Sequence, residues 1–241
     1  MPDYEALSSA TVEKGLEFDR YHSQGRIVSH VPPDQFVLDV GCNRGHIARA
    51  LVKKGCTVVG IEIDPEVAEE ARKVCKEVFL TDVETLAGFP YTKKAFDVIL
   101  FGDVLEHTVN PWKVLEGLKH YLKDDGRIVV SLPNIANWAI RLRLLFGIFT
   151  YEHTGILFDQ HLRFFTLKTA CELLKGAGFT IERVDATPGL HVSRIYDILL
   201  GRVLSKLPGY GFVVYQLCRT FKRLLCQQFI FIARPNTGKA P

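Results

Sequence analysis

A glycine-containing turn carries the residues with the clearest potential for ligand chemistry. It reads DVGCNRGH at residues 39–46 and follows an apolar run. Gly41 and Gly45 let the backbone approach a ligand closely, and Asn43 can adopt the left-handed conformation where a third glycine would be expected. The N–H groups of such a turn and of the helix that follows favour a polar or anionic ligand. A tight turn that binds no ligand can have the same pattern.

Two acids follow the turn at positions where a nucleotide could contact them. Glu62 stands twenty-one residues after Gly41, at the end of the second apolar run, and Asp82 follows the third run. A carboxylate at the first position can accept hydrogen bonds from both ribose hydroxyls, and one at the second could meet an adenine amino group. Either acid alone is also typical of a solvated strand end. Together with the turn, they predict a ligand site at the carboxyl edge of a sheet.

A nicotinamide-dependent dehydrogenase is the first alternative, because it also places an acid about twenty residues beyond its glycines. Such an enzyme requires G-x-G-x-x-G. Here Gly41 and Gly45 are four residues apart, with Asn43 between them. The spacing therefore disfavours a dehydrogenase.

Short apolar runs alternate with helical patterns, and this alternation must position the site. Continuous Val/Ile runs separated by helices predict parallel strands that are buried on both faces, in a doubly wound α/β sheet. Thr166 is the expected N-cap of a helix that ends at Gly176 or Gly178, and residues 124–126 (DDG) are expected to form a turn. Strands are expected at 36–40, 57–61, 78–80, 96–100, 127–132, 179–184 and 228–233, and further helices at 47–54, 66–76 and 111–122.

The charge balance and the cysteines limit the class of protein. The 30 Lys plus Arg and 27 Asp plus Glu give a net charge of +3, which offers no case for nucleic-acid binding. The charge is uneven, since residues 191–241 hold eight cations and one acid. The six cysteines have no zinc spacing and are expected to be free thiols. No signal-peptide pattern and no run of 18 apolar residues is found, so we expect a cytoplasmic protein.

The chain resembles the class I S-adenosylmethionine-dependent methyltransferases. The similarity lies in LDVGCNRGHIARAL, VVGIEIDPEVAEEA, FLTDVETL and FDVILFGDVLEHTVNPWKVLEGLKHYLKDDGRIVVSLPN, and it covers about residues 36–184 and the last strand. It implies a Rossmann-like sheet of seven strands, mostly parallel with an antiparallel last strand, and S-adenosyl-L-methionine as cofactor. By position, Asp39, Gly41 and Gly45 would flank the methionine moiety. The other implied cofactor contacts are Cys42, Asn43, Glu62 (ribose), Ile63 (adenine face), Asp82 (adenine amino group), Val83 and Phe101.

Two groups of residues are candidates for the methyl-transfer step. Asp103, Glu106 and His107 form D-x-x-E-H, which is similar to an arrangement in quinone-precursor O-methyltransferases, some of which use magnesium. Metal-free relatives show the same L-E-H, so we assign no metal. His161, before the helix at residue 166, is the first choice for a proton acceptor, and His153 is the second. A histidine that only stabilises the loop is the alternative for both.

The remaining segments are interpreted as parts of one domain of residues 1–241, with 1–35 as an N-terminal helical cap. Residues 134–165 are expected to form a lid, and their apolar run with Arg141 and Arg143 suits a core-packed helix, a cover for a hydrophobic substrate, or a membrane interface. The basic apolar insertion 191–223 suits a homodimer contact, an anionic substrate or a peripheral membrane contact.

We therefore expect a small-molecule methyltransferase, with a sugar, glycolipid, quinone precursor or secondary metabolite methylated on oxygen. No nucleic-acid partner is expected. The alternative is a non-catalytic S-adenosylmethionine-binding module that binds a membrane or a protein partner.

Overall fold

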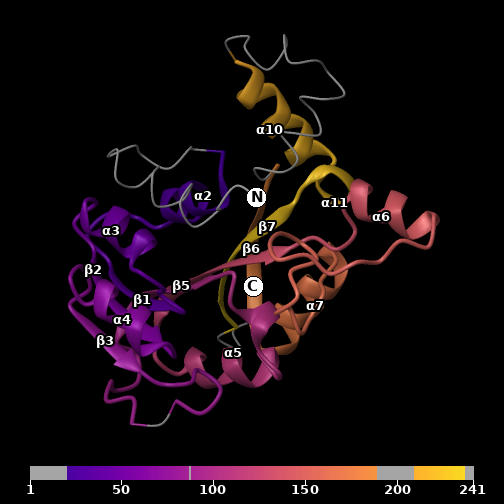
Figure 1. The fold of residues 1–241 in the computed structure, drawn as a ribbon. Coiled ribbons are helices and arrows are strands. Elements are labelled where there is room, and N and C mark those ends of the chain that lie inside the picture. The colour runs from indigo at the N-terminus through magenta and orange to yellow at the C-terminus, as the bar shows by residue number, and fades with distance from the viewer. Residues whose placement is uncertain (1–20, 87, 189–208, 237–241) are drawn as a thin grey trace.

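The computed structural model describes residues 21–86, 88–188 and 209–236, which form a twisted central sheet with helices around it (Figure 1). The strand order is β3-β2-β1-β4-β5-β7-β6. Strands β1 to β5 are parallel to one another, whereas β7 runs antiparallel to both β5 and β6. The strands are β1 (Phe36–Val40), β2 (Thr57–Glu62), β3 (Glu77–Leu80), β4 (Phe96–Gly102), β5 (Leu122–Pro133), β6 (Phe179–Thr187) and β7 (Gln228–Pro235).

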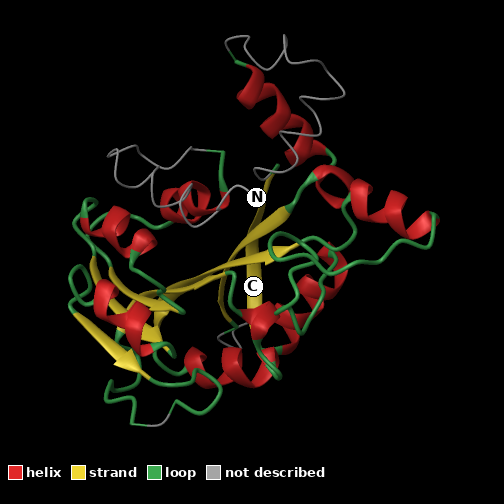
Figure 2. Ribbon diagram, in the orientation of Figure 1, coloured by secondary structure: helices red, strands yellow, loops and turns green. Residues whose placement is uncertain are grey.

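This topology confirms the expected seven-stranded, mostly parallel sheet with an antiparallel last strand. The central strands consist largely of buried Val, Ile, Leu and Phe, as strands covered on both faces must. Helices lie on both sides of the sheet (Figure 2). The helices are α2 (Ser23–His30), α3 (His46–Val52), α4 (Pro65–Ala71), the 3₁₀ helix η1 (Leu105–His107), α5 (Pro111–Lys119), α6 (Trp138–Leu145), α7 (Leu167–Gly176), α10 (Tyr210–Thr220) and α11 (Lys222–Leu225).

Two apolar clusters divide the core between the two faces of the sheet. Helices α2, α3 and α4 pack against one face, while α5 and α7 pack against the other. Capping residues and prolines in the sequence determine where α4, α5 and α7 begin. Asp64 caps α4, Asn110 caps α5, and Pro occupies the first turn of each helix. Thr166 caps α7 in a capping box with Thr169, which confirms the predicted N-cap.

Two expected elements differ from the structure. Residues 124–126 lie inside β5 rather than in a turn before it. The register between β4 and β5 jumps from Phe96↔Leu122 to Val98↔Arg127, so the extra residues bulge out of the ladder. Helix α4 ends at Ala71, several residues before the predicted end. The chain must turn there to place Glu77 at the start of β3, and the N–H of Lys76 already donates to the Val58 carbonyl.

A buried carboxylate joins the N-terminal helix to the C-terminal part of the fold. Asp185 of β6 accepts hydrogen bonds from Arg26 and His30 of α2, and from the hydroxyl of Tyr215 of α10 at 3.1 Å. Burial would raise the pKa of Asp185, but the hydrogen bonds from His30 and Arg26 outweigh it and hold the pKa well below its usual range. These bonds fix α2 against the sheet, so Gln24 of α2 can line the candidate site.

The segment assigned to a lid is described in full, whereas the proposed insertion is described only in part. Residues 134–165 contain α6, which projects from the body of the molecule (Figure 1). Of the proposed insertion 191–223, residues 191–208 lie outside the described residues, as does most of the proposed cap 1–35. Among the helices that are described, none has the length and apolar character needed to cross a bilayer.

Candidate functional site

The turn between β1 and α3 has the backbone conformation that its sequence predicts. Gly41, Asn43 and Gly45 have φ values of +65°, +46° and +73°. A Cβ on Gly41 would lie 2.7 Å from a methyl carbon of Val104, so glycine is required there by both conformation and space. The prediction that Asn43 replaces a glycine in the left-handed region is therefore confirmed, and the turn keeps its backbone close to the sheet edge.

The carboxylate of Glu62 holds this turn in place. One oxygen accepts a hydrogen bond from the N–H of Asn43 at 2.8 Å, and the other accepts from the N–H groups of Ile63 at 2.8 Å and Asp64 at 3.1 Å. The residue is 9% exposed, so these charge-assisted bonds are little weakened by water. The Glu62 carboxylate therefore links the turn after β1 to the residues that follow β2.

Three adjoining pockets lie along the carboxyl edge of the sheet. The first, which we call the adenosine-side pocket, is lined by Ile61, Glu62, Ile63, Thr81, Asp82, Val83, Glu84, Val104, Thr108, Gly41 and His107. The turn-side pocket is lined by Gln24, Asp39, Gly41, Cys42, Asn43, Arg44, His46, Ile47, Gly102 and Asp103. The acceptor pocket is lined by Asp103, Glu106, His107, Pro133, Gly155, Ile156, Phe158, His161, Gln227 and Gln228.

Shared lining residues show how the three pockets connect. Gly41 lines both the adenosine-side and turn-side pockets, Asp103 lines the turn-side and acceptor pockets, and His107 lines the adenosine-side and acceptor pockets. Asp103 has φ +60°, and its N–H donates to the Ser131 hydroxyl at 2.9 Å, which holds the strained residue at this junction. A ligand that fills the first two pockets would thus bring its central atoms to the mouth of the third.

Asp39 is a buried acid in the turn-side pocket. It is 1% exposed, and its Oδ2 atom has no hydrogen-bond partner among the described residues. Burial raises the pKa of Asp39 to about 7, and the nearby charge of Glu62 adds to the increase. The carboxyl group therefore changes its charge near neutral pH, where a cationic ligand group in the same pocket would favour the ionised form.

We expect cofactor affinity to depend on pH through Asp39. The ammonium group of a bound methionine moiety is cationic below about pH 8. Affinity should therefore rise between about pH 6 and pH 7.5 as Asp39 ionises, and binding should release protons. Isothermal titration calorimetry with S-adenosylmethionine, in buffers of different ionisation enthalpy, measures both quantities.

Asp39→Asn is the matched variant, because it keeps the shape of the side chain and removes the titration. Its affinity should be flat over this range. The same variant should unfold with a larger free energy than the wild type above pH 7, since folding raises the pKa of Asp39 and the ionised carboxyl then destabilises the fold. The stability difference should vanish below about pH 4. If the affinity of Asp39→Asn for S-adenosylmethionine varied with pH as that of the wild type does, Asp39 would not be the titrating group.

The acceptor pocket brings His161 and His107 together. Their rings are 4.8 Å apart, centroid to centroid. Nδ1 of His161 lies 3.1 Å from the carbonyl oxygen of Ile156, and Nδ1 of His107 lies 3.1 Å from that of Gln160. A carbonyl oxygen only accepts, so both Nδ1 atoms carry a proton, and in a neutral ring the free lone pair is then on Nε2. Burial lowers the pKa of His161, which keeps its imidazole neutral and able to accept a proton.

Glu106 is the most unusual residue of the pocket. It is fully buried, and neither carboxyl oxygen has a hydrogen-bond partner among the described residues. Burial raises the pKa of Glu106 well above its ordinary value, and the charge of Asp103 adds to this. Its backbone carbonyl accepts from the N–H groups of Leu162 and Arg163 at 2.8 and 3.0 Å. Glu106 therefore anchors the segment that carries His161.

Glu106, His107 and His161 also form a donor set for a cation. Each offers one ligand atom, and the three atoms lie within 4.8 Å of one another. One carboxylate and two imidazoles suit Zn²⁺, Mn²⁺ or Fe²⁺ better than Mg²⁺, which prefers oxygen ligands. A cation there would stabilise the ionised form of Glu106.

All of the predicted cofactor residues except Phe101 and Gly45 line the first two pockets, and the catalytic candidate His153 lines none of the three. Phe101 is buried in the hydrophobic core and lines none of the three pockets, because β4 turns its side chain inward. His153 has a side chain that is 90% exposed, and its Nδ1 lies 3.2 Å from Asp159. Gly45 acts through the backbone as the N-cap of α3. The structure thus brings His161, and not His153, to the acceptor pocket.

Three residues that line the pockets were not predicted from the sequence. Gln227 and Gln228 enter the acceptor pocket because β7 runs antiparallel, so its first residue pairs with Pro133 at the end of β5. The expected antiparallel last strand was the signal that could have identified them. Gln24 reaches the turn-side pocket from α2, and no sequence pattern pointed to it.

Comparison with known proteins gives a consistent result. A family model described as "Methyltransferase domain" matches residues 26–184. A ubiquinone biosynthesis O-methyltransferase from Actinobacillus pleuropneumoniae serotype 5b (strain L20) is 36% identical over 106 residues, which cover 41% of this chain and 45% of the relative. One from Idiomarina loihiensis is 30% identical over 188 residues, covering 70% and 69%. The chain thus spans less than half of the first relative and about two thirds of the second.

A solved structure shows the same fold with ligands bound. It is the Burkholderia thailandensis 1,6-didemethyltoxoflavin-N1-methyltransferase with 1,6-didemethyltoxoflavin and S-adenosylhomocysteine. The TM-score is 0.56 at 18% identity, and the match covers 96% of this chain and 84% of that one. At this identity, the similarity is one of fold.

Proposed function

The chain belongs to the class I S-adenosylmethionine-dependent methyltransferases, and we propose that it methylates a hydroxyl oxygen of a small aromatic acceptor of the quinone-precursor class. The observation that carries the proposal is the junction of the pockets at Gly41, Asp103 and His107. The cofactor would occupy the adenosine-side and turn-side pockets, with its sulfonium at the junction. The acceptor would then meet the methyl group from the third pocket.

The chemistry requires little from the protein beyond position and one proton acceptor. The acceptor oxygen attacks the methyl carbon, the carbon–sulfur bond breaks, and its electron pair goes to sulfur to give S-adenosylhomocysteine. The hydroxyl proton goes to Nε2 of neutral His161. A divalent ion held by Glu106, His107 and His161 would instead lower the pKa of the acceptor hydroxyl, whose proton would then pass to water.

Support for an aromatic acceptor comes from the lining of the acceptor pocket. Pro133, Ile156 and Phe158 supply apolar surface, while His161 and Gln228 supply polar groups. An aromatic ring with adjacent hydroxyl groups matches both kinds of surface. The names of the Actinobacillus and Idiomarina relatives point to the same class of acceptor.

A turnover assay tests the proposal. Chelator-treated protein is incubated with methyl-labelled S-adenosylmethionine and a soluble catechol, with an aniline of similar shape as the nitrogen acceptor, and with or without added Mg²⁺, Mn²⁺ or Zn²⁺. We expect labelled methyl ether and S-adenosylhomocysteine from the catechol. Transfer only to the aniline would contradict O-methylation. Tight cofactor binding without transfer to any acceptor, including lipid extracts, would favour a non-catalytic binding module.

A further inference from the structure

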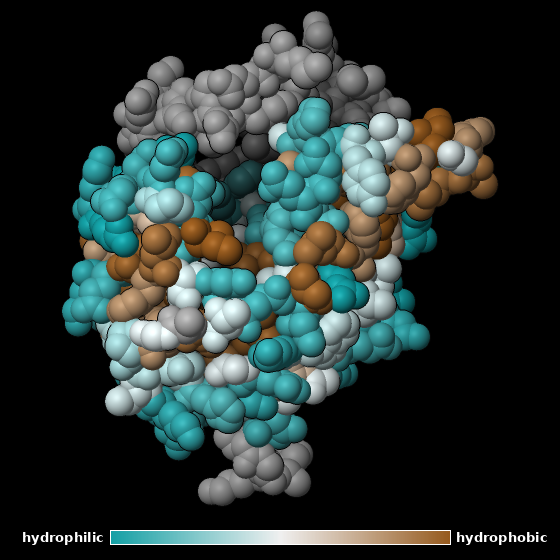
Figure 3. Space-filling model, turned by 60° about the horizontal axis from the view of Figure 1, so that its bottom comes forward, coloured by the Kyte–Doolittle hydropathy of each residue, from teal (hydrophilic) through white to brown (hydrophobic). Residues whose placement is uncertain are grey.

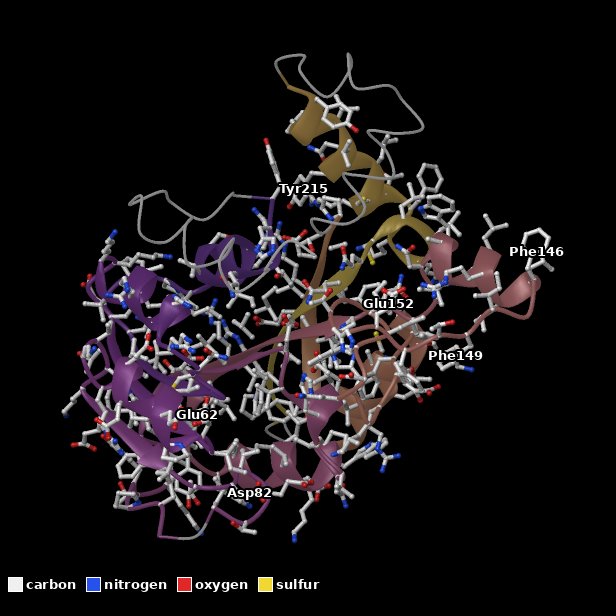
Figure 4. All side chains as sticks on the ribbon, viewed as in Figure 1. Glu62, Asp82, Phe146, Phe149, Glu152 and Tyr215 are labelled. Carbon is white, nitrogen blue, oxygen red and sulfur yellow. The ribbon has the colours of Figure 1, made fainter. Side chains whose placement is uncertain are left out.

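Helix α6 and the loop after it expose an unusually large apolar surface. Ile140 is the buried residue of this helix, whereas Leu145 and Phe146 are 77% and 72% exposed. Figure 3 shows hydrophobic side chains gathered on this projection, and Figure 4 shows Phe146 at its end. A surface helix normally buries one apolar stripe, and contiguous exposed patches mark interaction sites. The α6 surface comprises Leu142, Leu144, Leu145, Phe146, Ile148, Phe149 and Tyr151, which are all at least 44% exposed.

The C-terminal helices extend the α6 surface and add positive charge. The Asn137 side chain at the start of α6 donates to the carbonyl groups of Leu225 and Cys226, at 3.3 and 3.0 Å, so α11 is fixed beside α6. Phe221 and Leu224 are 56% and 41% exposed at this junction. Residues 209–227 contain Arg219, Lys222 and Arg223 and no acid. Arg219 pairs with Asp185 of β6, so Lys222 and Arg223 supply the added charge.

The pattern of charge favours a bilayer with anionic lipids over a second copy of the chain. Exposed aliphatic and aromatic side chains next to cations are typical of segments that lie in the lipid interface. Arg141 is exposed on α6, and Arg223 is exposed on α11. In a symmetric dimer, this surface would face itself and bring the cations of both copies together. Phosphate headgroups would instead neutralise them.

The α6 surface is connected through the chain to two sides of the acceptor pocket. The loop after Tyr151 continues into Gly155, Ile156 and Phe158, which line that pocket. The chain after α11 continues into Gln227 and Gln228, which line its other side. Figure 4 shows Phe149 on this side of the molecule and Glu62 on the opposite, cofactor side. The segments that carry the α6 surface and α11 thus also form part of the wall of the acceptor pocket, on the side of the molecule away from Glu62.

We propose that the α6 surface docks on an anionic phospholipid bilayer, and that the acceptor is a membrane-borne amphiphile whose aromatic head enters the acceptor pocket. The docking stands on the α6 surface and the cations beside it, and it does not depend on the proposed activity. The identity of the acceptor as an amphiphile rests on the methyl transfer proposed above.

Vesicle flotation tests the docking. The probes are vesicles of phosphatidylcholine alone and of phosphatidylcholine with phosphatidylglycerol, incubated with the full chain. We expect flotation with the anionic vesicles, weakened by high salt. The double variant Leu145→Glu/Phe146→Glu should lower the partition constant at least about tenfold, because two side chains that enter the interface become charged. Val52→Glu, at a 43% exposed position of α3, is the matched control and should float as the wild type does.

Three outcomes would overturn the docking. One is that the wild type fails to float with anionic vesicles. Another is that the double variant floats as well as Val52→Glu. The third is that light scattering without lipid shows a dimer that the double variant abolishes, which would assign the surface to a second copy. Circular dichroism checks that each variant is folded.

Turnover separates this inference from the proposed function. With a soluble catechol, the double variant should match the wild type, since none of its changed residues lines the three pockets. With a long-chain acceptor embedded in anionic vesicles, its rate should fall at least about tenfold, in parallel with binding. Equal rates on the embedded acceptor would contradict delivery from the bilayer. Flotation without turnover on either acceptor would leave the docking intact and contradict the proposed function.

Discussion

Replacing His161 by alanine is expected to lower kcat about 10²- to 10⁴-fold, the usual contribution of a positioned proton acceptor, and to leave the dissociation constant of S-adenosylmethionine unchanged. His161 lines the acceptor pocket, not the two pockets assigned to the cofactor. Its bond to Ile156 leaves Nε2 as the free acceptor, and burial lowers the pKa of His161, so the ring is neutral at pH 7. Steady-state kinetics with a catechol, together with calorimetry of cofactor binding, measures both effects.

The pH profile distinguishes a proton acceptor from a residue that only stabilises the loop. Because folding lowers the pKa of His161, the wild-type kcat at saturating S-adenosylmethionine should stay high as the pH falls to about 6.5 and decline below it. The residual activity of His161→Ala should lack this decline. His153→Ala is the matched control, since His153 is exposed, and it should keep the wild-type rate and profile. A wild-type profile in His161→Ala, or a loss of cofactor binding, would contradict the proposed role.

The acceptor side shows why part of the site could not be predicted. His153 and His161 lie in one polar aromatic segment, and only the folded loop determines which of them is buried. The loop is held by the carbonyl of Glu106, which bonds to the two residues after His161. That contact spans more than fifty residues of sequence and follows no local period. The choice of histidine therefore depends on tertiary contacts.

The turn and the strand ends that line the first two pockets could be placed from the sequence, because they follow from local rules. Each of these features stands where a strand ends: the left-handed residues follow β1, one acid ends β2, and another acid follows β3. Because the strands are parallel, their carboxyl ends meet at one edge of the sheet. Phe101 is the exception. It was assigned by position in the family pattern, but the alternation of side chains along β4 places it in the core. The position of a residue in a motif therefore predicts its strand. Which side chains of the strand can reach a ligand depends on the face of the sheet to which each side chain points.

Glu62→Ala is expected to weaken S-adenosylmethionine binding by about 1 to 3 kcal/mol, or about 5- to 150-fold, as the loss of hydrogen bonds to a charged group should. Glu62 lines the adenosine-side pocket, where its carboxylate can accept from the ribose hydroxyls. Its three backbone bonds leave about one acceptor site for this, on the oxygen that binds the N–H of Asn43, since two carboxylate oxygens accept about four hydrogen bonds. Calorimetry with S-adenosylmethionine measures the effect, and Glu66→Ala, an exposed acid of α4, is the matched control.

The same carboxylate also fixes the turn, so two causes of weaker binding must be separated. If Glu62 acts on the ribose, the loss should be larger for S-adenosylmethionine than for methionine, which lacks a ribose and would occupy only the turn-side pocket. If Glu62 only orders the turn through the N–H of Asn43, both ligands should weaken by the same factor. Glu62→Gln keeps one carbonyl oxygen but replaces the other acceptor by a donor, so its affinity should fall between those of the wild type and Glu62→Ala. Equal loss for the two ligands would therefore assign Glu62 to the turn and remove it from the ribose contact.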